Sequence, residues 1–258
     1  MLRAFASGSL FGESFGASEP WVVALHGWGR SHADFSLVLG APVREGEGSE
    51  REEGPELDAV AIDLPGFGAT PPPPEPWGSE QYAHAVSPLL EQCAPKVVLL
   101  GHSFGGKVAV RLADARPDRV AAVVLSGTPL FLPEGRARRA PAGYRAVRAL
   151  ARAGIVGEER LERARRRHGS PDYRAASGVM RGVLVRTLQE RYEGSLGRIS
   201  CPVELVWGEQ DEEVRVEVAR RAAAVLADAR VVCVPGVGHM TPRDAPRALR
   251  DALERHRP

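Results

Sequence analysis

The most specific chemical signal in the sequence is a G-x-S-x-G motif around Ser103. It lies in the segment 96–107, KVVLLGHSFGGK, where an apolar run ends and a helical pattern begins. A serine at such a strand-to-helix turn has a strained backbone, and Gly101 and Gly105 leave room for the strand and helix to approach closely. The turn projects the hydroxyl outward and brings the amino end of the next helix beside it, so the Phe104 N–H can donate to a developing oxyanion. The motif predicts that Ser103 is a nucleophile.

A serine hydroxyl needs a base, because it is almost un-ionised at neutral pH, and the base needs a group that orients it. The segment VPGVGH ends at His239 in a glycine-rich turn after an apolar run, which makes His239 the predicted base. The segment VWGEQD follows the preceding apolar run in the same way and makes Asp211 the predicted acid. Glu209 is a local alternative for the acid, and Ser103 as an ordinary helix cap is the alternative for the nucleophile.

A second oxyanion donor is predicted in the segment HGWG, residues 26–29, which follows the first buried apolar run. The N–H of Trp28 is the candidate, because the flanking glycines let the backbone bend toward the developing charge. His26 and His102 flank these motifs, and we expect both to be buried, hydrogen-bonded structural residues rather than bases.

The elements that must position these residues alternate along the chain. Helical patterns cover 104–115 and 214–226, and 43–56 and 71–76 have the composition of surface loops. Most of the short apolar runs have the pattern of strands buried on both faces, so the order predicts a mostly parallel sheet covered by helices. These runs are 21–25, 57–62, 96–100, 120–125, 203–207 and 230–234.

The interval 128–199 interrupts this alternation. It lacks clear strands, is rich in Arg, Ala and Leu at helical spacing, and is predicted to be an inserted helical lid. It contains 16 arginines against seven acidic residues, an excess that could steer an anionic substrate, with Arg136, Arg138 and Arg139 at its start. All basic residues except Lys96 and Lys107 are arginine, so a general arginine bias on a solvated helix face is the competing explanation.

Length and composition match an ordinary soluble globular protein. The chain has 258 residues, 43% hydrophobic and 26% charged, with a net charge of +1, so one domain is expected and neither nucleic acid nor a membrane is expected as a partner. The first 16 residues have no apolar run of secretory-signal length, which favours a cytoplasmic location. Cys93, Cys201 and Cys233 are few and widely spaced, so we expect buried free thiols, and neither a disulfide framework nor a metal site.

Five segments, HGWG, DLPGFG (63–68), GHSFGG, WGEQD and GVGH, resemble the α/β-hydrolase superfamily in sequence and in order. The resemblance implies an eight-stranded, mostly parallel sheet formed by residues 1–127 and 200–258, with 128–199 as a helical cap. It also implies a Ser103–His239–Asp211 triad that hydrolyses a small-molecule ester without a cofactor. The chain looks most similar to small esterases and to C–C hydrolases of aromatic ring-cleavage pathways. Dehalogenase and epoxide-hydrolase relatives have an aspartate at the position of Ser103, which argues against their chemistries.

Two questions stay open at this stage. Leu130, Phe131 and Met240 adjoin strand ends or triad loops and are candidates for an apolar acyl pocket, with ordinary core packing as the alternative for each. Hydrolysis of a C–C bond in a dicarbonyl acid would use the same triad, and a receptor-like binding protein with slow turnover would keep the same fold. The sequence does not predict the natural substrate or the oligomeric state.

Overall fold

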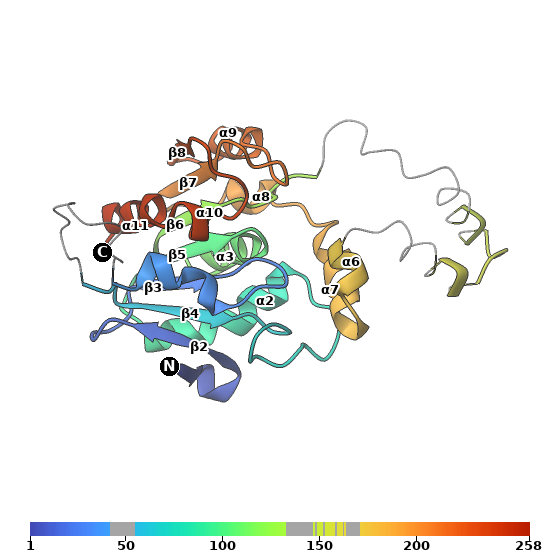
Figure 1. The fold of residues 1–258 in the computed structure, drawn as a ribbon, viewed down its shortest axis with the longest axis horizontal. Coiled ribbons are helices and arrows are strands. Elements are labelled where there is room, and N and C mark those ends of the chain that lie inside the picture. The colour runs from blue at the N-terminus through green and yellow to red at the C-terminus, as the bar shows by residue number, and fades with distance from the viewer. Residues whose placement is uncertain are drawn as a thin grey trace.

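A single sheet runs through the computed structural model, which describes residues 1–41, 55–132, 147, 149–151, 153–157, 159–161, 163 and 171–258 (Figure 1). Within these residues the sheet has eight strands in the order β1-β2-β4-β3-β5-β6-β7-β8. β2 pairs antiparallel with β1 and β4, and all other neighbours are parallel. The expected eight-stranded, mostly parallel sheet is therefore confirmed. The strands are β1 (Leu2–Phe5), β2 (Leu10–Phe15), β3 (Val22–Leu25), β4 (Ala59–Asp63), β5 (Val97–His102), β6 (Val120–Ser126), β7 (Val203–Gly208) and β8 (Ala229–Val234).

Burial along the strands follows their place in the sheet. Every residue of β3, β4, β5 and β7 is buried, as expected for apolar runs covered on both faces. β8 has no buried residue, because it lies at the edge of the sheet. For the same reason Cys233 is exposed, whereas Cys93 is buried and Cys201 is partly buried. The expectation of buried free thiols is thus correct only for Cys93.

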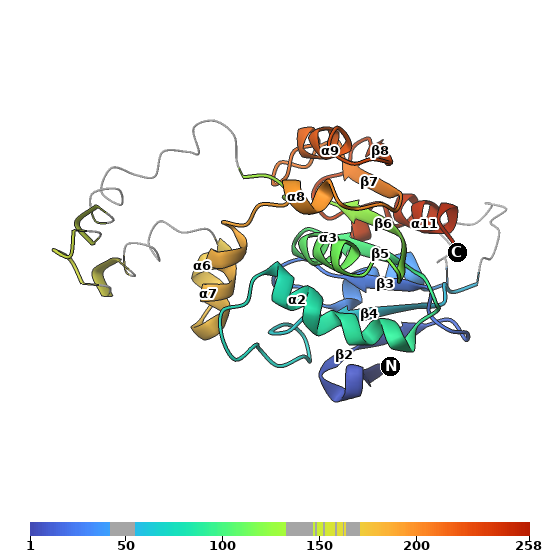
Figure 2. The same ribbon diagram turned by 180° about the vertical axis from the view of Figure 1, so that it is seen from behind.

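Helices cover both faces of the sheet. On one face α2 (Ser79–Val86), α3 (Phe104–Ala115) and α9 (Glu217–Ala223) pack in the larger apolar core, as Figure 2 shows from that side. On the other face α1 (Ser36–Leu39) and α11 (Pro246–Arg255) form a second core with the sheet. Three-residue to six-residue 3-10 helices, η1 (Ala6–Gly8), η2 (His32–Phe35) and η3 (Ser87–Gln92), complete the connections with the short helix α10 (Thr241–Asp244).

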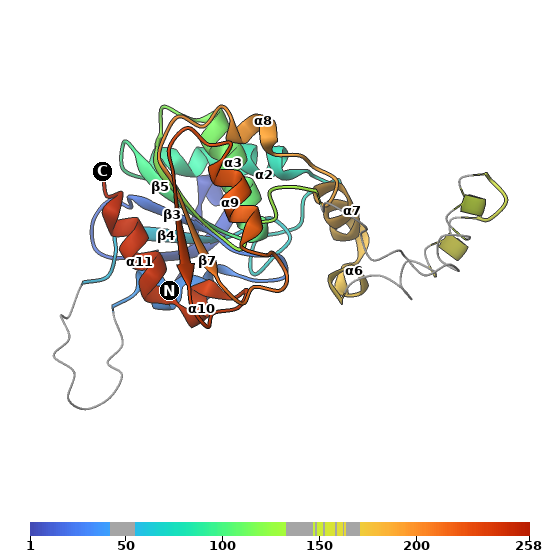
Figure 3. The same cartoon turned by 90° about the horizontal axis from the view of Figure 1, so that it is seen from above.

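The described part of the interval 128–199 contains no strand. α6 (Pro171–Ala175) and α7 (Gly178–Thr187) lie beyond the strand ends, at the side of the molecule seen in Figures 1 and 3. α8 (Glu193–Leu196) packs against α3, and Leu196 and Ile199 belong to the larger core. Arg136, Arg138 and Arg139, and most of the predicted loop 43–56, fall outside the described residues. The second predicted loop, 71–76, contains neither helix nor strand.

A buried lysine joins the sheet domain to α7. Lys107, one turn after Ser103 on α3, donates from Nζ to the Thr187 carbonyl at 2.9 Å and lies 5.7 Å from the centre of the Tyr192 ring. Burial lowers the pKa of Lys107 from 10.5 to about 8, although the charge of Glu190 opposes this. One of the two lysines of the chain is thus buried against the end of α7, where burial disfavours its charged form.

We expect this lysine to make stability rise with pH in a defined window. Between about pH 8 and 10.5 folded Lys107 loses its proton while the unfolded chain keeps it, so the unfolded state binds more protons and the free energy of unfolding increases with pH. From pH 7 to 10 the wild type should gain about 2 kcal/mol relative to Lys107→Met, measured by urea unfolding. Lys96→Met is the matched control, because Lys96 is exposed. An equal pH dependence in all three proteins would contradict the assignment.

Candidate functional site

Ser103 occupies a strained turn between β5 and α3. Its φ of 50° and ψ of −111° lie in a region that only glycine adopts readily, and no side-chain capping hydrogen bond is made to α3. Ser103 is partly exposed, while its neighbours His102 and Phe104 are buried. The strain therefore presents the hydroxyl at the surface of the turn, and the helix-cap alternative has no hydrogen bond to support it.

Close packing explains the glycines of the motif. A Cβ at Gly105 would lie 1.9 Å from the Leu25 carbonyl oxygen, and one at Gly101 would lie 2.5 Å from the Gly106 Cα. Such distances are below any real Cβ contact, so a side chain at either position would push α3 away from the sheet. The sequence-based prediction of this close approach is confirmed.

His239 and Asp211 are in direct contact. His239 Nδ1 lies 2.8 Å from Asp211 Oδ2, and both residues follow the ends of neighbouring strands, β8 and β7. Asp211 Oδ1 accepts the N–H groups of Glu213 at 2.9 Å and Val214 at 2.8 Å, which fixes the orientation of the carboxylate. Asp211 is buried and Glu209 is exposed, so the geometry favours Asp211 as the partner of the histidine.

The charge on Asp211 controls the protonation of His239. Burial disfavours the imidazolium, but the hydrogen bond to Asp211 and the negative charges of Asp211 and Glu213 outweigh burial and raise the pKa of His239 above 6.5. With its Nδ1–H donating to Asp211, a neutral His239 has a free lone pair at Nε2 to accept a proton. This is the protonation state that a general base requires.

The imidazole of His239 lies at the carboxyl edge of the sheet beside the serine turn. The His239 and His102 rings are 4.9 Å apart, and a Cβ at Gly127, just after β6, would lie 2.8 Å from His239 Cε1. Within the described residues Ser103 Oγ makes no hydrogen bond. Catalytic hydrogen bonds are often long without substrate, so this observation is compatible with Ser103 and His239 as the predicted nucleophile and base.

The two predicted oxyanion donors belong to segments that adjoin Ser103. The Phe104 N–H is the first of α3 and has no acceptor within the helix. The loop that carries Trp28 packs against the serine turn, because a Cβ at Gly27 would lie 3.4 Å from Ser103 Cβ. In the described part of the chain neither the Trp28 nor the Phe104 N–H donates to a backbone carbonyl outside regular elements. Both are therefore available to an added ligand.

Aromatic side chains surround this turn. The Trp28 ring lies 5.0 Å from the Phe67 ring and 5.5 Å from the Phe104 ring, in both cases edge to face. Trp28 also packs against the small cluster formed by Tyr173 and Leu184 of α6 and α7 together with Ala176. α6 and α7 thus contact the loop of the predicted oxyanion hole. Phe67 was not predicted as a site residue, although its segment, DLPGFG, is one of the five that resemble the α/β-hydrolase superfamily.

The three predicted pocket residues have different surroundings. Leu130 is fully buried in the larger core, which matches the core-packing alternative. Phe131 is 9% exposed, and the Arg221 guanidinium lies 3.9 Å from its ring centre. Met240 is partly exposed and directly follows His239 at the start of α10. Phe131 is buried in the same core as Leu130, so core packing describes both, and of the three residues only Met240 is partly exposed.

The comparison with known proteins agrees with this geometry. A sequence model of the Alpha/beta hydrolase family matches residues 22–252. The chain belongs to the α/β-hydrolase family. It is an enzyme of that family, with the strand order and the serine turn described above.

Several relatives of this α/β-hydrolase are named after ester or lipid substrates. It is 29% identical to a pimeloyl-[acyl-carrier protein] methyl ester esterase of Chromobacterium violaceum, over 95% of this chain and 98% of that protein. It is 45% identical to lipase LipV of Mycobacterium tuberculosis over 85 residues, 33% of this chain and 32% of that protein. An esterase from Thermogutta terrifontis has the same fold, with a TM-score of 0.67 at 21% identity and full coverage of both chains. A 2-hydroxy-6-oxo-6-phenylhexa-2,4-dienoate hydrolase from Rhodococcus has a TM-score of 0.68 at 21% identity, over 99% and 98% of the chains.

The other histidines near the α/β-hydrolase site are buried and neutral. His26 Nε2 accepts the Leu64 N–H at 3.0 Å, Nδ1 lies 2.7 Å from the Gly27 carbonyl oxygen, and burial lowers the pKa of His26 to about 4. Burial and the nearby His239 lower the pKa of His102 to about 3. His26 is hydrogen-bonded as expected, and His102 has a hydrogen bond with the Ser126 backbone, although its Nδ1 is buried without a partner.

The described residues contain no group of three or more His, Cys, Asp or Glu side chains that could hold a metal ion. No helix among them is both long and apolar enough to cross a bilayer.

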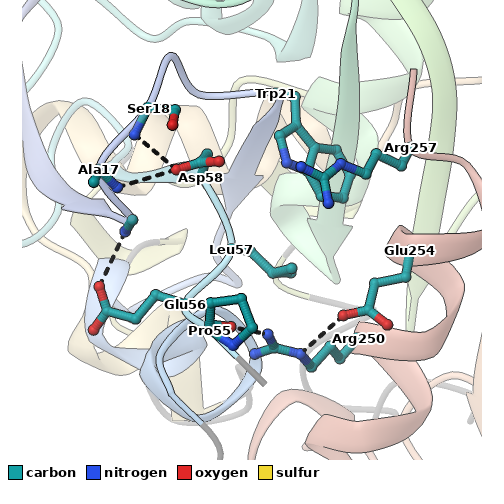
Figure 4. Close-up of a pocket in the computed structure, with 11 residues that line it drawn as sticks. Ala17, Ser18, Trp21, Pro55, Glu56, Leu57, Asp58, Arg250, Glu254 and Arg257 are labelled. Atoms are coloured by element: carbon teal, nitrogen blue, oxygen red, sulfur yellow. Dashed lines mark hydrogen bonds and ion pairs between the residues drawn. The ribbon is translucent and has the colours of Figure 1, made fainter. Parts of the chain in front are cut away.

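A cavity lies away from this chemistry. It has a volume of about 830 Å³ and is lined by residues before β3 and β4, by α11 and by Arg257 after α11, and the lining includes Trp21, Asp58 and Arg250 (Figure 4). Because it adjoins the amino ends of the parallel strands, it is at the opposite edge of the sheet from Ser103. Its charged groups have partners, such as Glu254 for Arg250 and the Trp21 ring for Arg257, and none of the predicted site residues reaches it.

Proposed function

We propose that this α/β-hydrolase is a serine esterase in which Ser103 is the nucleophile, His239 the base and Asp211 the acid. The observation that carries the proposal is the 2.8 Å contact between His239 Nδ1 and Asp211 Oδ2 beside a serine held at a φ of 50°. Serine, acid and histidine follow one another in the chain in the family's order.

The first half of the proposed reaction forms an acyl-enzyme. Ser103 Oγ attacks the ester carbonyl carbon while His239 Nε2 takes the serine proton, and Asp211 stabilises the imidazolium. The carbonyl oxygen becomes an oxyanion that accepts hydrogen bonds from the N–H groups of Trp28 and Phe104. One such preorganised donor typically contributes about 3 kcal/mol to the transition state.

The second half releases both products. The tetrahedral intermediate collapses, its bond to the alcohol oxygen breaks, and the His239 imidazolium gives its proton to the leaving alcohol. Water then attacks the acyl-enzyme, with His239 again as base, to give the carboxylic acid and free Ser103. No external oxidant, reductant or cofactor enters this sequence.

The substrate that fits best is a small ester with an apolar acyl group. The aromatic rings of Trp28, Phe67 and Phe104 lie beside the nucleophile, and α6 and α7 contact Trp28. We propose that residues 128–199 form a cap whose α6 and α7 border the acyl site, with Phe131 and Met240 at its margin. An anionic group on the substrate, steered by the arginines of this interval, remains a prediction from the sequence.

Two other functions use the same fold. The relatives named esterase and lipase favour an ester as the bond cleaved, while the Rhodococcus hydrolase shares only the fold at 21% identity. The direct contact between His239 and Asp211 supports turnover over a receptor role. C–C hydrolysis of a dicarbonyl acid is the alternative that an assay must separate.

The purified protein should hydrolyse short aryl esters. Its kcat/KM should rise with pH along a single ionisation, that of His239. Because the pKa of His239 is raised above 6.5, its midpoint should lie above pH 6.5, and activity should be lost as pH falls through it. Stopped-flow or plate-reader assays with p-nitrophenyl esters from pH 5 to 9 measure this. His84→Gln should leave the midpoint unchanged, because His84 is an exposed residue of α2. Faster turnover of a dicarbonyl acid than of any ester would favour the alternative function.

A further inference from the structure

A second carboxylate faces the base of the proposed triad from the opposite side to Asp211. Glu213 Oε2 lies 3.6 Å from His239 Nε2, the nitrogen that must take the serine proton. The imidazole therefore lies between two carboxylates, with Asp211 at Nδ1 and Glu213 at Nε2.

The position of Glu213 is built into the loop after β7. Its backbone N–H donates to Asp211 Oδ1 at 2.9 Å, and the Val214 N–H donates to the same oxygen at 2.8 Å. The carboxylate that orients His239 thus also fixes the turn that carries Glu213. Of the neighbouring residues Glu212 and Glu213, only Glu213 is thereby directed toward His239 in the described residues.

The surroundings of the imidazole leave Glu213 as the second charge that acts on it. Among the described residues, the titratable groups that face His239 are Asp211, Glu213 and His102. His102 is neutral above about pH 3, so it carries no charge in the working range. Gly127, at the end of β6, presents only backbone to the ring.

We propose that Glu213 is a positioning residue that holds protonated His239 at Nε2 and so sets the pH at which the enzyme becomes active. The inference rests on the proposed role of His239 as base. At low pH the Nε2–H faces Glu213, which stabilises the resting, protonated form. When His239 loses this proton, the Nε2 lone pair becomes available to the Ser103 hydroxyl, and Glu213 no longer attracts the ring.

The effect must be modest, because the Glu213 side chain is 74% exposed and its charge is screened by water. Glu213→Gln should lower the pKa of His239, and with it the midpoint of the kcat/KM profile, by about 0.2 to 0.7 pH units at low salt. At pH values below the midpoint, the variant should therefore retain a larger fraction of its maximal kcat/KM than the wild type does. In 1 M salt the Debye length falls to about 3 Å, so the difference between the two proteins should shrink.

Two readouts test the proposal separately. NMR titration of the His239 Cε1–H signal, assigned by its loss in His239→Gln, gives the pKa without any substrate. The pH profile of ester hydrolysis gives the kinetic midpoint. If no ester is turned over but the NMR shift appears, the proposed function fails and the Glu213–His239 interaction stands.

Glu212→Gln is the matched control, since it removes the same charge from the neighbouring exposed residue. No contact between Glu212 and His239 occurs in the described residues. We expect Glu213→Gln to shift the His239 pKa and Glu212→Gln to leave it within about 0.1 unit. An unchanged pKa in Glu213→Gln, or equal shifts in both variants, would overturn the proposal.

Discussion

Ser103→Ala should lose ester hydrolysis by about 10³- to 10⁶-fold in kcat, the usual range for removal of a triad member. The physical reason is that alanine removes only Oγ, which is the attacking atom in the proposed mechanism. The remaining turnover would come from the N–H groups of the predicted oxyanion hole and from His239, which stays hydrogen-bonded to Asp211. Initial rates with a p-nitrophenyl ester measure the loss.

The same variant should fold normally. Ser103 Oγ caps no helix, so its removal breaks no structural hydrogen bond within the described residues, and alanine experiences the same positive φ as serine. The free energy of unfolding should therefore stay within about 1 kcal/mol of the wild type. A variant that is both folded and fully active would place the nucleophile elsewhere.

Asp211→Asn should reduce kcat by about 10³- to 10⁴-fold with little change in KM. The amide keeps the shape of the carboxylate and an acceptor for the Glu213 and Val214 N–H groups, so the loop is preserved. It removes the charge that stabilises the imidazolium, and its NH₂ group can donate to Nδ1, which forces the proton onto Nε2. In that tautomer His239 cannot accept the serine proton.

Glu209→Gln is the control for the acid, because Glu209 is the local alternative and is exposed. It should change kcat less than threefold. A severe loss in Glu209→Gln together with a mild loss in Asp211→Asn would reverse the assignment of the acid.

Much of the nucleophile region could be predicted from sequence because its signals are local. The helix expected at 104–115 is α3 without a shift, and the strand expected at 96–100 is β5 at 97–102. The motif requires glycine at positions 101 and 105, because a side chain at either position would collide with the backbone packed beside it. Such local constraints restrict the residue types at these positions, so the motif can be recognised from the sequence.

Elements that depend on the edge of the sheet were harder to predict. β1 has three exposed residues out of four, and β2 contains Gly12 and Ser14, so neither forms an apolar run. They form strands because β2 pairs antiparallel with β1 and β4. The helix expected at 214–226 is shorter in the structure, where α9 spans 217–223.

The second carboxylate at the histidine left no trace in the sequence. Glu212 and Glu213 look like a solvated pair of charges in a surface loop. Their difference arises only when the Asp211 turn places one of them 3.6 Å from an imidazole that comes from 28 residues downstream of Asp211. A contact of this kind requires the tertiary fold.

The most direct test of the triad is to locate a fluorophosphonate adduct by mass spectrometry. Because lysines flank the serine turn, trypsin releases residues 97–107 as the single peptide VVLLGHSFGGK, in which Ser103 is the one hydroxyl side chain. We predict stoichiometric labelling of the folded wild type, with the phosphonate mass on this peptide and fragment ions that place it on Ser103. Labelling should be absent in Ser103→Ala. An adduct on another peptide, or undiminished labelling of folded Ser103→Ala, would contradict the assignment of Ser103 as the nucleophile.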